Sequence, residues 1–432
     1  MSWFYNAVFF IFAVFSIPKF LVRLNQARNG KELFKQRFGI FSKYWAKQFQ
    51  NKKVLWLHAV SVGEVNAAKN WLRLFLKEYS DWTVAFSTTT PTGQEIAQSF
   101  GSERVSVFYA PIDISFIVRR VIEAIHPKLI VLMETELWPN LISQAYQKDI
   151  PIGIINGRIS PRSFSRYRFV RGWVAKLLRQ LSFCLVQSER DESYFRSLGM
   201  EDKKLFLTGN LKFDLNGQKP ADLNVPLGLL PDGVVFLAGS THWNEEEILL
   251  RVFGRLRTDF RNLQLILAPR HPEQLSRVIE AVKRCSYQPK LFSEMENTPS
   301  EFFDVLIVDR MGVLASLYAF ADLVFIGGSF VPRGGQNPFE AACFKKPILH
   351  GPQVFNFQEI YTKLAQCHAS IQVSSEEELY QNSRELIEKS HFRAEMGLRA
   401  WKAIQSMKGV TERTINYLSR WIEMKDSSEA LV

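Results

Sequence analysis

The sequence predicts an α/β protein built from two Rossmann-like domains that face each other across a cleft. Short apolar, β-branched segments alternate with helical patterns over most of the 432 residues. A Pro/Gly/Asp-rich interval at 216–233 divides these segments into two series. Near-continuous apolar strands separated by helices are typical of parallel sheets covered on both faces. The chain is also longer than a domain with a single hydrophobic core usually is.

The first series predicts seven strands, at 54–60, 83–90, 105–111, 129–135, 151–157, 183–188 and 205–210. The second predicts six, at 234–240, 263–269, 305–309, 323–329, 347–351 and 370–373. From about residue 376 the pattern is helical. The expected domains are therefore 29–218 and 219–424, the second including the C-terminal helices, with a flexible tail at 425–432.

Residues 1–28 are expected to form an N-terminal membrane anchor with a basic flank. Trp3 to Pro18 is a nearly continuous apolar run, and residues 1–50 carry eight Lys/Arg against Glu32 alone. The basic residues follow the apolar run, unlike in a cleaved signal peptide, and the positive-inside rule then keeps the body cytoplasmic. A buried N-terminal helix is the alternative. Anionic lipid explains the basic segment more simply than nucleic acid, because no zinc-finger spacing or RNP-type motif accompanies it.

Composition excludes several classes of protein. Apolar residues make up 47% and charged residues 22%, which describes a globular chain with a net charge of +11. The four cysteines are scattered, which argues against a disulfide scaffold or a structural zinc site. GxGxxG with its distant acidic partner, GxxxxGK[ST], HExxH and GxSxG are all absent, which disfavours dinucleotide oxidoreductases, P-loop NTPases, metalloproteases and serine hydrolases.

The polar residues at the strand ends are the candidates for function, because open α/β sheets bind ligands beyond the carboxyl ends of their strands. Ser61-Val62-Gly63-Glu64 fits a capping box, so Glu64 is either a helix cap or a carboxylate placed to take a proton. Glu134 and Glu136 flank Thr135 at the end of the strand predicted at 129–135, and we expect one of them to face a ligand and the other to face the protein. Glu134 is the one we select. Holding Arg158 or Arg162 is the rival role for either glutamate.

Strand ends of the second half are typical of an anion-binding face. Arg270 follows an apolar strand and is either a surface charge or a phosphate fork, and we expect the neighbouring His271 to be a hydrogen-bonding wall residue. In "GGQNPFEAA", Asn337 can cap a helix whose amides bind phosphate, while Glu340 can accept hydrogen bonds from a ribose diol. A well-capped helix without a ligand is the alternative. Together these features indicate a nucleotide-sugar transferase beside a membrane.

Ten motifs in register resemble those of the 3-deoxy-D-manno-octulosonic acid (Kdo) transferases of lipopolysaccharide core synthesis. They are "HAVSVGEV", "FSTTTPTG", "PIDI", "METELWPN", "NGRIS-PRSFSRY", "GNLKFD", "GSTH", "PRHPE", "GGSF" and "GGQNPFE". The resemblance covers nearly the whole chain, to about residue 360. It implies a metal-independent, cofactor-free inverting transferase of the GT-B fold on the cytoplasmic side of the inner membrane, with no nucleic-acid partner. Such an enzyme moves Kdo from CMP-Kdo to the tetra-acylated lipid A precursor, lipid IVA, and releases CMP.

The resemblance also assigns residues. It makes 29–218 the acceptor-binding domain and 219–424 the donor-binding domain. It places the general base on Glu64 and the transition-state stabilisers on Glu134 and Lys212, although a solvated lysine is the plain alternative for Lys212. The implied CMP contacts are Pro269, Arg270, Met311, Gly312, Val313, Asn337, Pro338, Phe339 and Glu340. Arg158 and Arg162 are expected to contact the acceptor phosphates.

The sequence departs from the family pattern in places. Trp243-Asn244 replace an acidic residue and glycine, Gly157 replaces alanine, and Arg310 and Val313 replace a small polar and an acidic residue. The cytidine contacts around Arg310–Val313 are therefore left open. Another membrane-associated GT-B transferase using a UDP-sugar is the enzyme alternative. A membrane-tethered nucleotide-binding protein without activity is the non-enzyme alternative.

Overall fold

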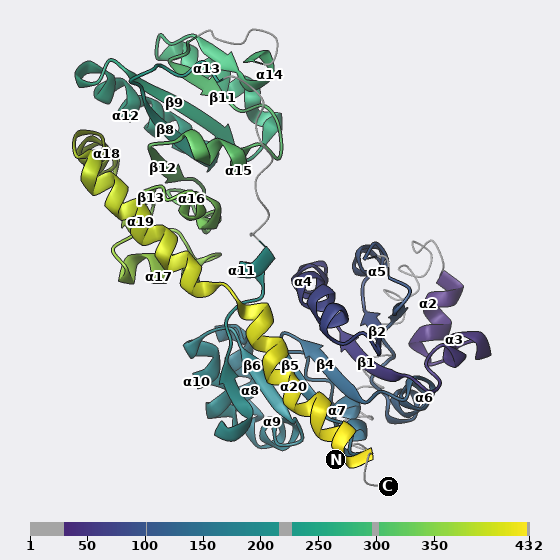
Figure 1. Ribbon diagram of the computed structural model, residues 1–432. Helices are drawn as coiled ribbons and strands as arrows, with labels where there is room; N and C mark the ends of the chain where they lie inside the picture. The colour runs from purple at the N-terminus through teal and green to yellow at the C-terminus, as the bar shows by residue number, and fades with distance from the viewer. Residues whose placement is uncertain (1–29, 101, 216–226, 296–301, 430–432) are drawn as a thin grey trace. The chain divides into compact units, whose positions relative to one another are not determined.

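The structure, a computed structural model, describes residues 30–100, 102–215, 227–295 and 302–429. Two compact units make up the chain (Figure 1). One comprises Met1–Leu215 and Gly409–Val432, and the other Asn216–Lys408. The predicted anchor, 1–28, lies outside the described residues. Within the described part of the chain, no helix combines the length and apolarity needed to cross a membrane.

The first unit contains a parallel seven-stranded sheet in the order β3-β2-β1-β4-β5-β6-β7. Its strands are β1 (Lys53–His58), β2 (Trp82–Thr88), β3 (Val105–Tyr109), β4 (Leu129–Met133), β5 (Ile152–Gly157), β6 (Phe183–Val186) and β7 (Leu205–Leu207). Its helices are α2 (Gly30–Arg37), α3 (Lys43–Lys47), α4 (Val62–Glu78), α5 (Pro91–Gln98), α6 (Ser115–Ile125), α7 (Pro139–Gln147), α8 (Pro161–Phe169), α9 (Arg171–Leu178), α10 (Glu189–Leu198), η1 (Asp202–Lys204), α11 (Lys212–Leu215) and α20 (Val410–Glu429).

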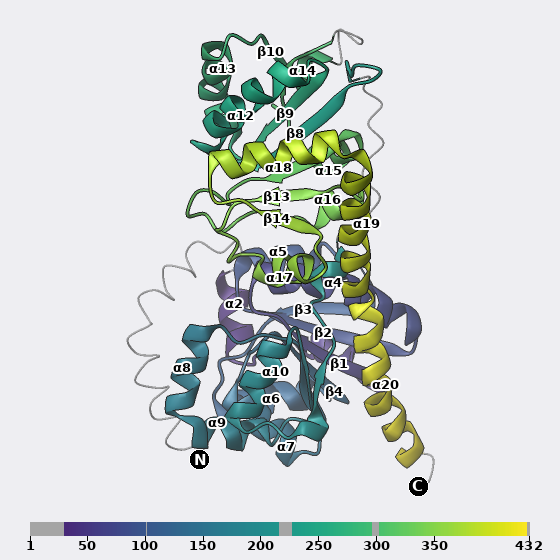
Figure 2. The same cartoon turned by 90° about the vertical axis from the view of Figure 1, so that its left-hand side faces the viewer.

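The second unit repeats this plan with a parallel sheet in the order β10-β11-β9-β8-β12-β13-β14. Its strands are β8 (Val234–Thr241), β9 (Leu263–Pro269), β10 (Pro289–Leu291), β11 (Val305–Ile307), β12 (Leu323–Ile326), β13 (Ile348–His350) and β14 (Ser370–Gln372). Its helices are α12 (Glu245–Asp259), η2 (Pro272–Gln274), α13 (Leu275–Arg284), α14 (Phe292–Met295), α15 (Leu314–Leu317), η3 (Tyr318–Phe320), α16 (Phe339–Cys343), α17 (Gln358–Gln366), α18 (Glu376–Glu388) and α19 (Ser390–Met407). Helix α18 packs against α12 (Figure 2).

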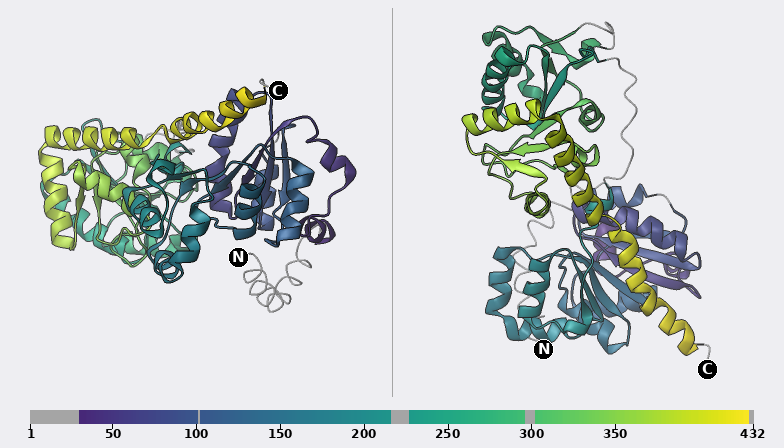
Figure 3. Two further views of the ribbon diagram at one scale, coloured as in Figure 1. Left: turned by 90° about the horizontal axis from the view of Figure 1, so that it is seen from below. Right: turned by 60° about the vertical axis from the view of Figure 1, so that its left-hand side comes forward.

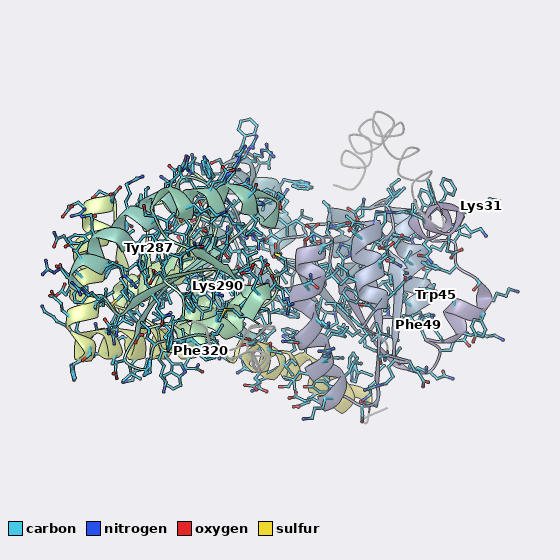
Figure 4. All side chains as sticks on the ribbon, turned by 90° about the horizontal axis from the view of Figure 1, so that it is seen from above. Lys31, Trp45, Phe49, Tyr287, Lys290 and Phe320 are labelled. Carbon is cyan, nitrogen blue, oxygen red and sulfur yellow. The ribbon has the colours of Figure 1, made fainter. Side chains whose placement is uncertain are left out.

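Alternation along the strands sorts the core of the first unit into two layers. In β1, Val54 and Trp56 join the layer formed with α6, α7 and α9, whereas Leu55 and Leu57 join the layer formed with α4, α5 and α20. Trp45 of α3 stacks edge-on against buried Phe49 at the margin of the first layer (Figure 4). Both faces of the parallel sheet are therefore covered, as its apolar strands require.

The domain bounds differ from the expected ones at the C-terminus. Helix α20 belongs to the first unit and packs against its helices (Figure 1, Figure 3). The Tyr417 ring lies against Phe206, and the Trp421 ring lies against Phe183. The helices α4 and α5 pack on the β1–β2 side of this layer, and α20 adds cover beside β6 and β7. The helix also runs through Glu429, into the segment expected to be a tail.

Candidate functional site

Two loops of the first unit leave its sheet at the point where the strand order reverses. Strand β1 pairs with β2 on one side and with β4 on the other. The chain first adds β2 and β3 on one side of β1, and then adds β4 to β7 on the other side. Ligands of open α/β sheets bind at such a switch point, beyond the carboxyl ends of the strands. The loop after β1 leads to Glu64 and the loop after β4 carries Glu134 and Glu136.

Glu64 forms the predicted helix cap, with one difference in its partner. Ser61 Oγ accepts the Glu64 N–H at 3.3 Å and donates its own hydroxyl to Glu64 Oε1 at 2.8 Å. Glu64 Oε2 accepts the N–H of Val60 at 2.8 Å, one residue before the serine amide that a capping box uses. The side chain is 6% exposed. Each carboxylate oxygen has a second lone pair, so each can accept one further hydrogen bond.

Burial changes the acidity of Glu64. It raises the pKa from 4.5 to about 7, against the hydrogen bonds from Val60 and Ser61, which lower it. The negative charges of Glu136 and Glu134 raise the pKa further. The helix dipole favours the ionised form of this group, but desolvation outweighs that effect. A carboxylate with a pKa near 7 exchanges a proton readily at neutral pH, which suits a general base.

Glu134 lies in an ion pair with Lys212. Lys212 Nζ is 3.6 Å from Glu134 Oε1, and both side chains are partly exposed. Glu134 adopts a positive φ of 55°, an unusual conformation for a residue other than glycine. The rival role of holding Arg158 or Arg162 is not what the structure shows for Glu134, because its ion-pair partner is Lys212.

Glu136 is the residue of this site that we did not select from the sequence. Its Oε2 accepts the indole N–H of Trp138 at 2.8 Å, and burial together with Glu134 raises its pKa. Trp138 in turn packs edge-on against His58 of β1. Burial and the positive charge of Arg37 lower the pKa of His58 to about 3, so this histidine is neutral. The sequence signal for Glu136 is the motif "METE", in which it follows Glu134 by two positions.

The short helix α11 places Lys212, and four polar groups hold it. Asn156 Oδ1 accepts the N–H of Leu211 at 3.0 Å, and Asn70 of α4 donates to the carbonyl of Asp214 at 3.2 Å. The Asp214 carboxylate accepts the N–H groups of Gly409 and Thr411, at 2.8 and 2.6 Å. Lys212 is thus tied to both α4, which carries Glu64, and the start of α20.

Arg158 and Arg162 lie exposed beside the same strand ends. Arg158 follows β5, where its N–H donates to Thr135 Oγ1 at 3.2 Å, and Arg162 lies in the first turn of α8 behind the Ser160 cap. Neither guanidinium makes an ion pair with another residue of the described ranges. Both are therefore available to an anionic ligand.

The second unit has its own switch point, between β8 and β12. The carboxylate of Glu245, which is fully buried, accepts the N–H groups of Gly328, Ser329 and Phe330 at 2.7 to 2.9 Å, and a fourth from His242. This internal anion fixes the "GGSF" loop against the start of α12. Desolvation nevertheless raises the Glu245 pKa.

Cationic groups gather at this edge of the second sheet. Arg270 is exposed at the end of β9, and its N–H donates to Thr241 of β8 at 2.9 Å. Burial, His271, Arg333 and Arg270 together lower the pKa of His242. The Nδ1 atom of His271 lies 3.2 Å from Oε1 of Glu273. Arg333 was not anticipated from the sequence, because its loop reaches this edge only through the fold.

The remaining predicted donor contacts differ in accessibility. Met311 is 66% exposed, and Gly312, at a φ of 87°, has open space where a side chain would be. Val313 caps α15 and Pro269 ends β9, both half-buried.

The "NPFE" segment is mostly engaged within the protein. Asn337 Oδ1 accepts the N–H of Phe339 at 3.0 Å, and Pro338 and Phe339 are buried. Within the described residues, the half-buried Glu340 carboxylate makes no hydrogen bond or ion pair, and burial raises its pKa. Of this segment, the Glu340 carboxylate and the side-chain NH2 group of Asn337 are available to a ligand within the described residues.

Among the residues that the structure describes, no group of three or more carboxylates, histidines or cysteines is placed to hold a metal ion.

Comparisons with known proteins agree on one family. The profile of the 3-deoxy-D-manno-octulosonic-acid transferase (kdotransferase) family matches residues 32–215. A 3-deoxy-D-manno-octulosonic acid transferase of Haemophilus influenzae is 34% identical over 373 residues, which cover 85% of this chain and 87% of that protein. One from Rickettsia bellii is 30% identical over 401 residues, covering 89% and 93%.

Solved structures agree on the fold. A glycosyltransferase from Rickettsia africae superposes with a TM-score of 0.55 at 12% identity, covering 86% of this chain and 99% of that one. The two parallel α/β units and this likeness support the GT-B fold class.

Proposed function

Because the chain belongs to the Kdo transferase family, we propose that it transfers Kdo from CMP-Kdo to lipid IVA with inversion and releases CMP. Kdo transfer by a glycosyltransferase follows from the family. The acceptor, the stereochemistry and the residue roles are the parts that we propose. The observation that carries the proposal is the buried Glu64, with a pKa of about 7, beside two further carboxylates at the switch point of the first sheet.

In the proposed reaction an acceptor hydroxyl attacks the ketosidic carbon of Kdo. A bond forms between that oxygen and the carbon, the bond from the carbon to the phosphate oxygen breaks, and CMP leaves with the electron pair. Glu64 takes the hydroxyl proton. A single displacement inverts the configuration. Both carboxylate oxygens of Glu64 already accept one hydrogen bond each, which fixes their direction and leaves one lone pair per oxygen for the substrate.

The ion pair of Lys212 with Glu134 supplies the electrostatic part of the proposal. The ammonium group is partly exposed and lies 3.6 Å from one carboxylate oxygen, so it can also pair with the carboxylate or phosphate of the donor. Positive charge placed where a leaving group gains negative charge lowers the barrier without reorganisation. Arg158 and Arg162, whose guanidinium groups are exposed, are proposed to bind the acceptor phosphates.

The second unit is proposed to bind the CMP moiety. Arg270 provides a phosphate fork, the Met311–Val313 loop provides accessible backbone, and Glu340 provides an acceptor for ribose hydroxyls. Pro338 and Phe339 act by shaping the loop, because both are buried, whereas the side-chain NH2 group of the half-buried Asn337 can donate to the phosphate. The one phosphate of CMP carries less charge than a nucleoside diphosphate, and we propose that transfer needs no metal.

The test is incubation of the purified protein with CMP-Kdo and lipid IVA, with products resolved by mass. We expect addition of Kdo, equimolar CMP, and an unchanged rate in excess EDTA. UDP-sugars are offered in parallel. Release of UDP without use of CMP-Kdo would overturn the proposed donor, and loss of activity in EDTA restored by a divalent cation would overturn metal independence.

Attachment to the cytoplasmic face of the inner membrane through residues 1–28 is also proposed. The basis is the apolar and basic sequence of that segment. Cell fractionation of the full chain and of a form starting at residue 29 tests it. We expect the full chain in the membrane fraction, and equal partitioning of the two forms would refute this role of the segment.

A further inference from the structure

A groove of about 320 Å³ lies on the first unit, along the C-terminal half of α4. Its other wall is the segment that enters the edge strand β3. Lys69, Arg73 and Lys77 line one side at four-residue spacing, so they share one face of the helix, and Arg104 lines the other side. The groove has no role in the proposed reaction.

The rim of the groove is entirely cationic. No carboxylate is among the described residues that line it. Arg104 is held in place by three carbonyl groups at the end of α4, those of Leu76, Tyr79 and Ser80, at 2.6 to 3.1 Å. These carbonyls are neutral, so the full positive charge of the guanidinium remains. The exposed Arg73 and Lys77 make no ion pair with another described residue.

The floor of the groove is apolar. It is formed by the half-buried side chains of Phe100 and Val105, whereas the lining residues Leu72 and Leu76 of α4 are almost fully buried. Lys69 Nζ lies 5.6 Å from the centroid of the Phe100 ring, so the ammonium group stands over this floor. A cationic rim over an apolar floor is complementary to a molecule that has an anionic head and a hydrocarbon part.

The groove is separate from the candidate catalytic carboxylates. Glu64 lies in the first turn of α4 and Lys77 in its last, thirteen residues apart, which is about 20 Å along a helix. The β3 segment that forms the other wall precedes its strand, whereas the carboxylates follow theirs. A ligand in the groove therefore lies toward the opposite edge of the sheet from Glu64.

We propose that this groove binds an amphiphilic anion, an acyl chain that ends in a phosphate or carboxylate head. The head pairs with Arg73, Lys77 and Arg104, and the chain covers the partly exposed Phe100 and Val105. Inorganic phosphate would leave this floor in water. A nucleotide would lack partners for its base edges, because Ser102 is the sole neutral polar side chain among the described lining residues.

Calorimetric titration of the full chain with octyl phosphate, butyl phosphate, inorganic phosphate and octanol, all as monomers, tests the proposal. We expect octyl phosphate to bind at least tenfold more tightly than butyl phosphate, since each buried methylene contributes about 0.8 kcal/mol. Inorganic phosphate and octanol are expected to bind weakly. The double variant Arg73→Ala/Lys77→Ala should bind octyl phosphate at least tenfold more weakly, with an unchanged melting temperature.

A matched control removes one lysine and one arginine elsewhere on the same unit. Lys176→Ala/Arg179→Ala, at the exposed end of α9, should bind octyl phosphate like the parent protein. Equal binding of phosphate and octyl phosphate, or an equal loss in both double variants, would overturn the proposal. Phosphatidylglycerol vesicles identify the source of the anion. Weaker vesicle binding by Arg73→Ala/Lys77→Ala indicates a membrane lipid, whereas unchanged vesicle binding with lost octyl phosphate binding indicates a soluble amphiphile.

Discussion

Replacing Glu64 with glutamine separates its two roles, because the amide preserves the cap and removes the base. The glutamine Oε1 can still accept the N–H of Val60, and its Nε2 can donate to the Ser61 hydroxyl, which then accepts where it formerly donated. The side chain has nearly the same volume as glutamate, so a buried site tolerates it. Transfer activity is expected to fall 10²- to 10⁴-fold, the usual contribution of a positioned general base.

The free energy of unfolding should change in the opposite direction from the activity, in favour of the glutamine variant. Folding raises the pKa of Glu64 from 4.5 to about 7, which corresponds to about 3 kcal/mol at 1.36 kcal/mol per pKa unit. The folded state thus favours the protonated form. This contribution is fully present below pH 4.5 and is lost as the pH rises through 7. The glutamine variant has no such loss, so from pH 5 to pH 8 the parent should lose up to about 3 kcal/mol of unfolding free energy relative to the variant.

Two measurements check this reasoning. The first is the pH dependence of kcat/KM between pH 5.5 and 9, where the parent should show an acidic limb with an apparent pKa near 7. The second is denaturant unfolding of both proteins at pH 5 and pH 8. The control is Ser61→Ala, which keeps the carboxylate but removes the hydroxyl that lowers its pKa, and should move the acidic limb upward while costing about 1 kcal/mol. Full activity of the glutamine variant would refute the base role.

Three further predictions concern the other site residues. Lys212→Ala should lower kcat at least 100-fold yet cost less than about 1 kcal/mol in stability, because its pair with Glu134 is partly exposed, and a matched loss of stability would contradict this. Arg270→Ala should raise the KM for CMP-Kdo about tenfold or more and leave the KM for lipid IVA unchanged, as steady-state kinetics with each substrate varied would show. Arg158→Ala/Arg162→Ala should do the reverse, and an unchanged acceptor KM would exclude those two arginines.

The strands could be predicted from the sequence because both sheets are parallel and buried on both faces. Segments such as 263–269, where Gln264 is the sole polar residue, read as nearly continuous apolar runs, and β9 has those same bounds (Leu263–Pro269). The strand that was missed, β10 (Pro289–Leu291), has three residues, begins with proline and lies at a sheet edge. It lacks the apolar run by which the other strands can be predicted, because an edge strand is not enclosed on all sides.

The placement of α20 could not be predicted in the same way. Its apolar stripe shows that the helix is buried on one face, but not which of two sheets it covers. Sequence order assigned it to the second unit. The aromatic residues Tyr417 and Trp421 find their partners more than 200 positions away, on β7 and β6. The sheet on which α20 packs is decided by the apolar surface that the preceding helices and strands leave uncovered.

Sequence reasoning found Glu64 but could not settle its acidity. The capping pattern predicts a helix dipole that favours the charged carboxylate, whereas the structure shows that burial dominates. Desolvation depends on the loops after β1 and β4 converging, and Glu136 adds its charge there. The selection of Glu134 over Glu136 assumed that only one of them faces a ligand, although residues two positions apart in a strand point to the same side. Both residues lie beyond the end of β4, where strand alternation no longer applies.

The motif "GNLKFD" shows how one short stretch carries both chemistry and architecture. Lys212 meets Glu134, while two residues later the Asp214 carboxylate accepts the first amides of α20. The carbonyl group of Asp214 also accepts a hydrogen bond from Asn70 of α4. Displacement of α20 would therefore loosen both Lys212 and the helix that carries Glu64. The C-terminal helix is therefore part of the scaffold of the carboxylate site, although it contributes no group to it.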